Sequence, residues 1–218
     1  MHRLVLVLLL LAPLPAVAQT FQALLGDRPI GTVTFARSGQ ADLSLTSDMT
    51  DTPLGVGDGT VRATSRPARL DDGSIVTQYV SAGRTSRKSR DISVLFDGGT
   101  VIDTVVTPAN ERTGLSDPGM VPAGVIDPVA ALGRLVEGAG CPAPFAFYDG
   151  RRVVAISTAA ERTVGGATVC DLNYTVTDGP GHLSPLRFRT LDVTATYSGG
   201  GLSVLTLGAG GFELRLVR

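Results

Sequence analysis

The chain has 218 residues, a formal net charge of −1 and 43% hydrophobic residues. This apolar fraction is too high for a disordered chain, and the near-neutral charge offers no basic surface for nucleic acid. The length suits one domain. With 27 Gly, 13 Pro, two Cys, two His and no Trp, the composition favours a turn-rich fold with few residues suited to catalysis.

The N-terminal segment Met1–Ala18 has the pattern of a secretory signal peptide. A short basic start precedes the apolar run Leu4–Leu11, and Ala16-Val17-Ala18 is a small-x-small cleavage site. The apolar run is much shorter than the roughly 20 residues that cross a bilayer, which disfavours an uncleaved anchor. We therefore predict cleavage after Ala18, a periplasmic location and a mature chain without a transmembrane segment.

The two cysteines are interpreted through this export signal. An even number of cysteines in an oxidising compartment favours a disulfide between Cys141 and Cys170. The alternatives are a metal site, which needs more ligands than two distant cysteines and His182, and a redox pair, which is more usually a C-x-x-C motif. The expectation is a structural bridge, with no metal and no cofactor.

Most of the chain after the signal peptide alternates between apolar and polar residues. The pattern is clearest over 92–96, 172–176 and 191–197. Such alternation is typical of antiparallel strands with one face on the core and one in water. Cys170 shares the parity of Leu172, so its sulfur is expected on the buried face. Glycine-rich turns separate the strands, and Asp149-Gly150 suits a type I′ hairpin.

One segment departs from the strand pattern. Asp127 suits an N-cap, Pro128 the first helical position and Gly138 the C-terminal stop, which predicts a helix of about nine residues. The segment 108–126 is expected to be a connecting loop.

These elements divide one domain, 19–218, into three parts. We predict an N-terminal sheet half over 19–107, the loop and short helix over 108–138, and a C-terminal meander over 141–218. The predicted fold class is all-β with one short helix: an antiparallel, curved or half-open barrel or sandwich. Eleven aromatic residues and no Trp disfavour an outer-membrane barrel, which needs aromatic girdles.

Three motifs in order give the chain a family resemblance. They are Asp127-Pro128 with Ala131-Leu132, then Phe147–Arg152, then Val169-Cys170 before the closing strands. In this order the chain resembles a bacterial exported family known as domain of unknown function 3108. The resemblance implies an exported, mostly antiparallel β fold of the lipoprotein-carrier kind, and it implies no reaction.

Two basic segments are candidate anion-binding sites. Arg87, Lys88 and Arg90 belong to a segment with four cations in seven residues, 84–90. Such a cluster can bind phosphate or an anionic envelope polymer, although a solvated loop is the simpler explanation. Arg151-Arg152 follows a tight turn and can face an anion, bridge to a neighbouring strand or face water.

The remaining candidate is His182, which lies two residues before Ser184. A histidine near a serine suggests a hydrolase, but the G-x-S-x-G motif of many hydrolases is missing. A solvated turn histidine is the simpler interpretation. No catalytic residue is therefore assigned.

The favoured function is a non-catalytic periplasmic protein that binds an apolar or amphipathic envelope component on its concave sheet. One alternative is a structural or assembly factor that acts through protein contacts. Another is a hydrolase that uses His182. Candidate partners are envelope lipid, glycan or protein, and nucleic acid is not expected.

Overall fold

The computed structural model describes residues 17–52, 58–86, 88–182 and 187–218. Most of the predicted signal peptide, and also Arg87 and Ser184, therefore lie outside the described residues. The first seven strands are β1 (Val17–Leu25), β2 (Arg28–Ser38), β3 (Asp42–Met49), β4 (Gly59–Arg69), β5 (Ile75–Thr85), β6 (Ser89–Asp97) and β7 (Thr100–Thr107). The later strands are β8 (Val125–Ile126), β9 (Phe145–Tyr148), β10 (Val153–Val164), β11 (Ala167–Asp178), β12 (Thr190–Ser198), β13 (Gly201–Ala209) and β14 (Phe212–Val217).

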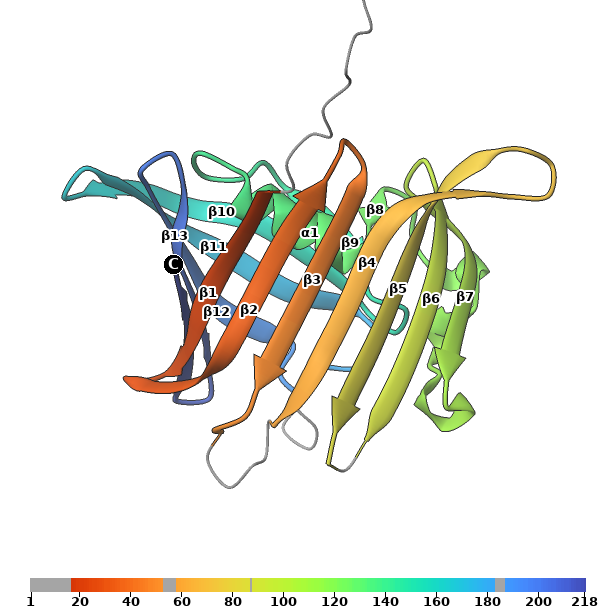
Figure 1. Ribbon diagram of the computed structural model, residues 1–218, viewed down its shortest axis with the longest axis horizontal. Coiled ribbons are helices and arrows are strands. Elements are labelled where there is room, and N and C mark those ends of the chain that lie inside the picture. The colour runs from red at the N-terminus through yellow and green to blue at the C-terminus, as the bar shows by residue number, and fades with distance from the viewer. Residues whose placement is uncertain (1–16, 53–57, 87, 183–186) are drawn as a thin grey trace, which may run out of the picture.

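These strands form one sheet that curls into a nearly closed barrel (Figure 1). The order is β7-β6-β5-β4-β3-β2-β1-β14-β13-β12-β11-β10-β9-β8, so β1 and β14 join the two halves of the chain. Neighbours are antiparallel except for β8 and β9, which run parallel. The all-β class with one short helix and a curved antiparallel sheet is confirmed.

The inward faces of the strands build one continuous core. Ile92, Val94 and Phe96 on β6 are all buried, as are Leu172 and Val176 on β11. The same cluster takes in residues from every long strand and from the helix. Period-two alternation therefore predicted the buried face correctly, because one side of each strand packs against the core.

Helix α1 (Pro128–Val136) lies inside the curve of the sheet (Figure 1). The Asp127 side chain caps it by accepting hydrogen bonds from the backbone N–H groups of Val129 (2.8 Å) and Ala130 (2.9 Å). Gly133 lets the helix approach β2 closely, since a Cβ there would lie 3.1 Å from the ring of Phe35. The interior of the barrel is thus filled by the helix and the core.

The segment predicted to be a plain loop has more structure than expected. It forms three 3₁₀ turns, η2 (Ala109–Glu111), η3 (Gly114–Ser116) and η4 (Pro118–Met120), before β8. The backbone N–H groups of Gly124 and Val125 then bond to the carbonyl of Gly99, 2.9 and 3.2 Å away. These bonds join the β8 end of the sheet to the β6–β7 turn.

The predicted cysteine pair is present at bonding distance. Cys141 and Cys170 form a disulfide with their Cα atoms 5.4 Å apart, and Cys170 is fully buried. The bridge joins the segment after α1 to the middle of β11. The helix exit is thereby fixed to the core.

The turn at Asp149-Gly150 is not the type I′ turn that we predicted. Only Gly150 has a positive φ, of 92°, whereas type I′ needs two such residues. The Asp149 side chain instead accepts hydrogen bonds from the backbone N–H groups of Arg151 and Arg152, both at 2.9 Å. This side-chain bonding replaces the expected backbone conformation.

Candidate functional site: a cationic cleft at one end of the barrel

A cleft of about 1030 Å³ opens at the end of the barrel where β3 and β5 end and β4 and β6 begin. The helix α1 lies toward the other end, where Glu137 forms an ion pair with Arg37 near the β2–β3 turn. The cleft walls come from segments far apart in the sequence: the start of β6, η2, the turn before β10 and the segment between β11 and β12. The end of β3, the start of β4 and the end of β5 complete the lining, so folding gathers distant segments around one opening.

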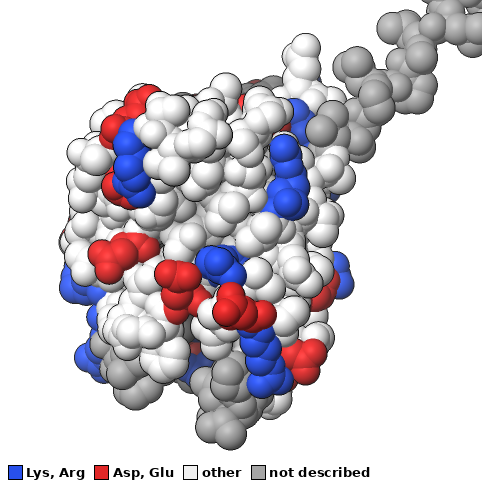
Figure 2. All heavy atoms as spheres, turned by 90° about the vertical axis from the view of Figure 1, so that its left-hand side faces the viewer, with Lys and Arg blue, Asp and Glu red and all other residues white. Residues whose placement is uncertain are grey.

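The described residues that line this cleft carry a large excess of positive charge. Seven are cationic and one, Glu111, is acidic. The cations are Arg84, Lys88, Arg90, Arg151, Arg152, Arg187 and Arg189. Elsewhere the charges are mixed: the side face in Figure 2 shows Lys and Arg interspersed with Asp and Glu. We call these seven cations with Glu111 the cationic cleft.

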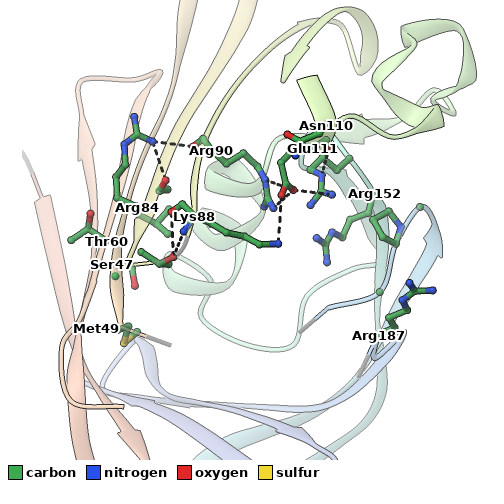
Figure 3. A pocket seen from close by; sticks show the side chains of 18 of the residues that line it. Ser47, Met49, Thr60, Arg84, Lys88, Arg90, Asn110, Glu111, Arg152 and Arg187 are labelled. Atoms are coloured by element: carbon green, nitrogen blue, oxygen red, sulfur yellow. Dashed lines mark hydrogen bonds and ion pairs between the residues drawn. The ribbon is translucent and has the colours of Figure 1, made fainter. Parts of the chain in front are cut away.

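Glu111 lies at the centre of one wall and contacts three cations (Figure 3). Arg90 donates to its carboxylate through Nε (3.2 Å) and through a second, shorter bond. Arg151 Nη2 lies 3.2 Å and Lys88 Nζ 3.5 Å from the same carboxylate. Arg151 also donates from Nε to the backbone carbonyl of Glu111, 2.6 Å away. One negative charge thus holds three positive charges in place.

The surroundings of Glu111 keep it ionised. Burial alone would raise the pKa of its carboxyl group. The hydrogen bond from Arg90 and the charges of Arg90, Arg151 and Lys88 outweigh burial and hold the pKa below its usual value. The wall therefore stays at three cations against one anion at neutral pH.

The turn before β10 is held by its neighbours, which fixes the direction of Arg151 and Arg152. Thr113 Oγ1 donates to the backbone carbonyl of Arg151 over 3.0 Å. A Cβ on Gly150 would lie only 2.5 Å from Ile92, so this turn packs tightly against β6. The backbone from which the Arg151 and Arg152 side chains extend is therefore held in one position.

Arg152 is buried and belongs to a polar chain behind the cleft wall. Its Nε lies 3.0 Å from the carboxylate of Asp149, and its Nη1 lies 2.8 Å from Nδ1 of His182. His182 Nε2 lies 2.7 Å from the hydroxyl of Tyr174. Because a guanidinium only donates, Nδ1 must accept and His182 carries its proton on Nε2.

Burial, and then the positive charge of Arg152, lower the pKa of His182 to about 4. The ring is therefore neutral at physiological pH. This corrects the expectation of a solvated turn histidine: His182 is partly buried and both ring nitrogens have partners. The ring also contacts Tyr174, with centroids 5.5 Å apart.

The other three cations occupy the remaining walls. Arg84 turns toward Asp91, with 2.6 Å between the nitrogen and the carboxylate oxygen. Arg189 donates to the backbone carbonyls of Val176 (2.7 Å), Thr177 and Gly179, and it has no ion pair with a described acidic residue. Arg187 has no ion pair or hydrogen bond with any described residue, and its φ of 52° is rare for a residue with a side chain.

The structure brings four of the six predicted surface candidates to this cleft. Lys88, Arg90, Arg151 and Arg152 line it, and His182 lies directly behind Arg152. Arg151 and Arg152 are largely buried and are held by Glu111 and Asp149, whereas the Lys88 side chain is 64% exposed, as the solvated-loop interpretation of its segment predicts. Arg87 lies outside the described residues.

Sequence reasoning missed Glu111, Arg187 and Arg189. Glu111 stands in a segment predicted to be a loop and has no motif around it. Arg187 and Arg189 are separated by one residue and precede a predicted strand. This spacing is the one feature of the sequence that could have identified them as candidates for a cationic site.

Two absences hold for the described residues. None of the helices among them is long and apolar enough to cross a bilayer. No group of three or more His, Cys, Asp or Glu side chains in the same part of the chain is placed to hold a metal ion.

Fold and cleft together define a barrel-like antiparallel β-protein with a cationic opening. No family model matches the chain, and no curated protein matches it in sequence. A solved structure that is similar is the crystal structure of a beta-barrel-like protein of domain of unknown function DUF1849 from Brucella abortus. It is 14% identical with a TM-score of 0.50, over 94% of this chain and 96% of that one.

This likeness shows the fold, and the neighbour belongs to a family of unknown function. It supports a β-barrel of that kind without supporting domain of unknown function 3108 in particular. The resemblance read from the sequence motifs therefore holds at the level of architecture alone.

Proposed function

We propose that the protein is a non-catalytic binding protein of the cell envelope that takes up an anionic, amphipathic component at the cationic cleft. The observation that carries this proposal is the excess of positive charge among the described lining residues: seven are cations, and the carboxylates of Glu111, Asp91 and Asp149 balance three of the seven charges. A cleft with this imbalance favours an anion.

Apolar side chains at the same opening support an amphipathic ligand. Val61 faces inward on β4, in register with Ser47 and Gly83, yet it is 38% exposed because the cleft leaves it uncovered. Met49 lies beside it in the lining. A ligand with an anionic head and an apolar part would have a surface for each.

The binding position differs from the one expected from the sequence. A carrier that used the concave face of the sheet would need space there, and α1 and the core fill it among the described residues. Among the described residues, the cationic cleft at the end of the barrel, with about 1030 Å³, is larger than the second cavity of about 430 Å³ beside α1. Export itself rests on the predicted signal peptide, and the Cys141–Cys170 bridge is in keeping with an oxidising compartment.

The hydrolase alternative gains no support from His182. A general base must accept a proton from its nucleophile, but Arg152 occupies the accepting nitrogen and Tyr174 contacts the other. The neutral ring instead holds Arg152 in position.

Titration calorimetry with three probes tests the proposal: dodecyl phosphate, inorganic phosphate and dodecyl maltoside. We expect dodecyl phosphate to bind most tightly and dodecyl maltoside most weakly, with affinity falling as salt rises. Lys88→Glu should weaken binding of dodecyl phosphate about tenfold or more, because it reverses a charge in the cleft.

The matched control is Arg66→Glu, the same kind of charge reversal on an exposed position of β4 that does not line the cleft. It should leave the affinity within about twofold of the unchanged protein. An equal loss in both variants, or no binding of any anion at low salt, would contradict the proposal.

A second candidate function, protein assembly, is favoured by a different surface. Ile102 and Val105 on the terminal strand β7 are 41% and 44% exposed, and Met120 on the adjacent η4 is 65% exposed. Exposed apolar side chains at a sheet edge are typical of contact surfaces. Crosslinking from a photoreactive residue at Val105 in the native host should then recover one defined partner, and recovery of the monomer alone would exclude it.

A further inference from the structure

The charges of the cationic cleft fall into two groups on different walls. On the first wall Lys88, Arg90 and Arg151 share Glu111, which leaves two positive charges unmatched. On the second wall Arg187 and Arg189 have no acidic partner among the described residues, which again leaves two positive charges unmatched. Figure 3 shows Arg187 on a different part of the rim from Arg90 and Glu111.

The other two cations do not add to this excess. Arg84 forms an ion pair with Asp91, and Arg152 with Asp149. Each of these pairs is neutral as a unit. The unmatched charge is therefore concentrated at two places.

A phosphate monoester carries a charge between about −1.5 and −2 at pH 7 and offers three acceptor oxygens. One such group would neutralise either wall. A carboxylate, with one negative charge, would leave each wall positive, and Glu111 already supplies one to the first wall. Arginine guanidinium groups also match phosphate oxygens in pairs.

The uncharged residues that line the cleft indicate the chemical class of the rest of the ligand. Ser47, Thr60, Ser86 and Asn110 add hydroxyl and amide groups at the opening. The described lining contains no aromatic ring on which a nucleobase would stack. Hydroxyls and cations without aromatics suit a phosphorylated sugar better than a nucleotide.

Resting on the proposed function, we infer that the ligand of this cleft carries two phosphate groups on a sugar scaffold, one for the Glu111 wall and one for the Arg187–Arg189 wall. Arg187 is the residue that discriminates two phosphates from one, because its guanidinium has no ion pair or hydrogen bond with the described residues. Glu111 orders the first wall and also opposes the anion that binds there.

The experiment compares glucose 1,6-bisphosphate with glucose 6-phosphate by titration calorimetry. The bisphosphate should bind at least tenfold more tightly. Arg187→Ala should remove most of this advantage and leave the affinity for glucose 6-phosphate within about threefold, because the first wall is intact. Arg66→Ala serves as the control and should change neither affinity.

A second variant keeps the inference testable if Arg187→Ala folds poorly. Arg187→Gln keeps a long polar side chain but removes the charge, and it should likewise remove most of the advantage of the bisphosphate over glucose 6-phosphate. An undiminished advantage in a folded Arg187→Gln protein would contradict the inference.

A further binding experiment with lipid vesicles distinguishes a lipid headgroup from a soluble phosphate ester as the ligand. Phosphatidylcholine vesicles containing a bisphosphorylated glucosamine-disaccharide lipid are compared with vesicles containing its monophosphorylated form. Tighter binding of the lipid than of glucose 1,6-bisphosphate would identify a lipid headgroup, and equal binding a soluble phosphate ester. In either case a preference for two phosphates supports the inference.

The results distinguish this inference from the proposed function. If dodecyl phosphate binds but one phosphate is as good as two, the two-phosphate inference is wrong and anion binding stands. If Arg187→Ala lowers the affinity for glucose 6-phosphate and for glucose 1,6-bisphosphate by the same factor, the assignment of one phosphate to each wall is wrong. If no anion binds at low salt, both the inference and the proposed function fail.

Discussion

Asp127 is the residue on which the attachment of the helix to the barrel most depends. Its side chain is 3% exposed. Oδ1 accepts from Val129 and Ala130 at the start of α1, and Oδ2 accepts from Ser65 Oγ on β4 over 2.7 Å. We predict that Asp127→Ala strongly lowers the free energy of unfolding.

The magnitude follows from the bonds removed. Loss of the N-cap costs about 1 kcal/mol, and a buried hydroxyl left without a partner costs about 1–3 kcal/mol. Asp127→Ala should therefore lower the stability by about 3 kcal/mol. Asp127→Asn keeps the acceptor for the helix and should cost about 1 kcal/mol, and Ser65→Ala a similar amount.

Urea unfolding followed by circular dichroism measures these differences. The double variant Asp127→Ala with Ser65→Ala should be more stable than the sum of the single losses implies, by about 1 kcal/mol, because the unpaired hydroxyl is gone. Asp117→Ala is the matched control: its exposed carboxylate caps η4 by accepting from Gly119 over 3.0 Å, and its loss should cost less than about 0.5 kcal/mol. If Asp127→Ala costs less than 1 kcal/mol, or the two losses simply add, the assigned role of the carboxylate is wrong.

Three other perturbations have defined outcomes in the same unfolding assay. The pKa of His182 is about 4 in the folded protein and near 6.5 in the unfolded chain, so the unfolded chain binds more protons between these two pH values. The free energy of unfolding should therefore fall by about 1–2 kcal/mol, after allowance for solvent screening, as the pH drops from 6.5 to 4. His182→Gln should abolish that part of the pH dependence, and an unchanged slope would contradict it. Replacing Cys141 and Cys170 by Ser opens a bridge that spans 29 positions, which should cost about 3.5 kcal/mol, whereas a loss under 1 kcal/mol would mean that the bridge constrains the unfolded chain little. Gly133→Val should cost about 2 kcal/mol because its side chain would enter the space of Phe35, and wild-type stability would refute the close packing.

The alternation of apolar and polar residues made the strands and their buried faces predictable. Leu172 and Val176 are buried because a residue's parity on a strand determines its face. The helix was predictable at its exact start because Asp127 and Pro128 act locally on the backbone. Structural features that depend on residues close together in the sequence could therefore be predicted from the sequence.

The cleft was only partly predictable because it depends on contacts between distant segments. Lys88 and Arg151 were candidates for their charge, but their common partner Glu111 is 23 and 40 positions away and has no local signature. The contacts of His182 likewise come from Arg152 in the turn before β10 and from Tyr174 on β11. Pairing in the sheet brings these residues together, and no sequence period encodes it.

The junction between β7 and β8 should be the least resistant part of the barrel wall to opening. Elsewhere adjacent long strands are joined by ladders of many rungs, whereas Gly99 meets Gly124 and Val125 through two backbone bonds. Under tension or heating, the circumference should part first along this line, while the opposite junction of β1 and β14 remains intact.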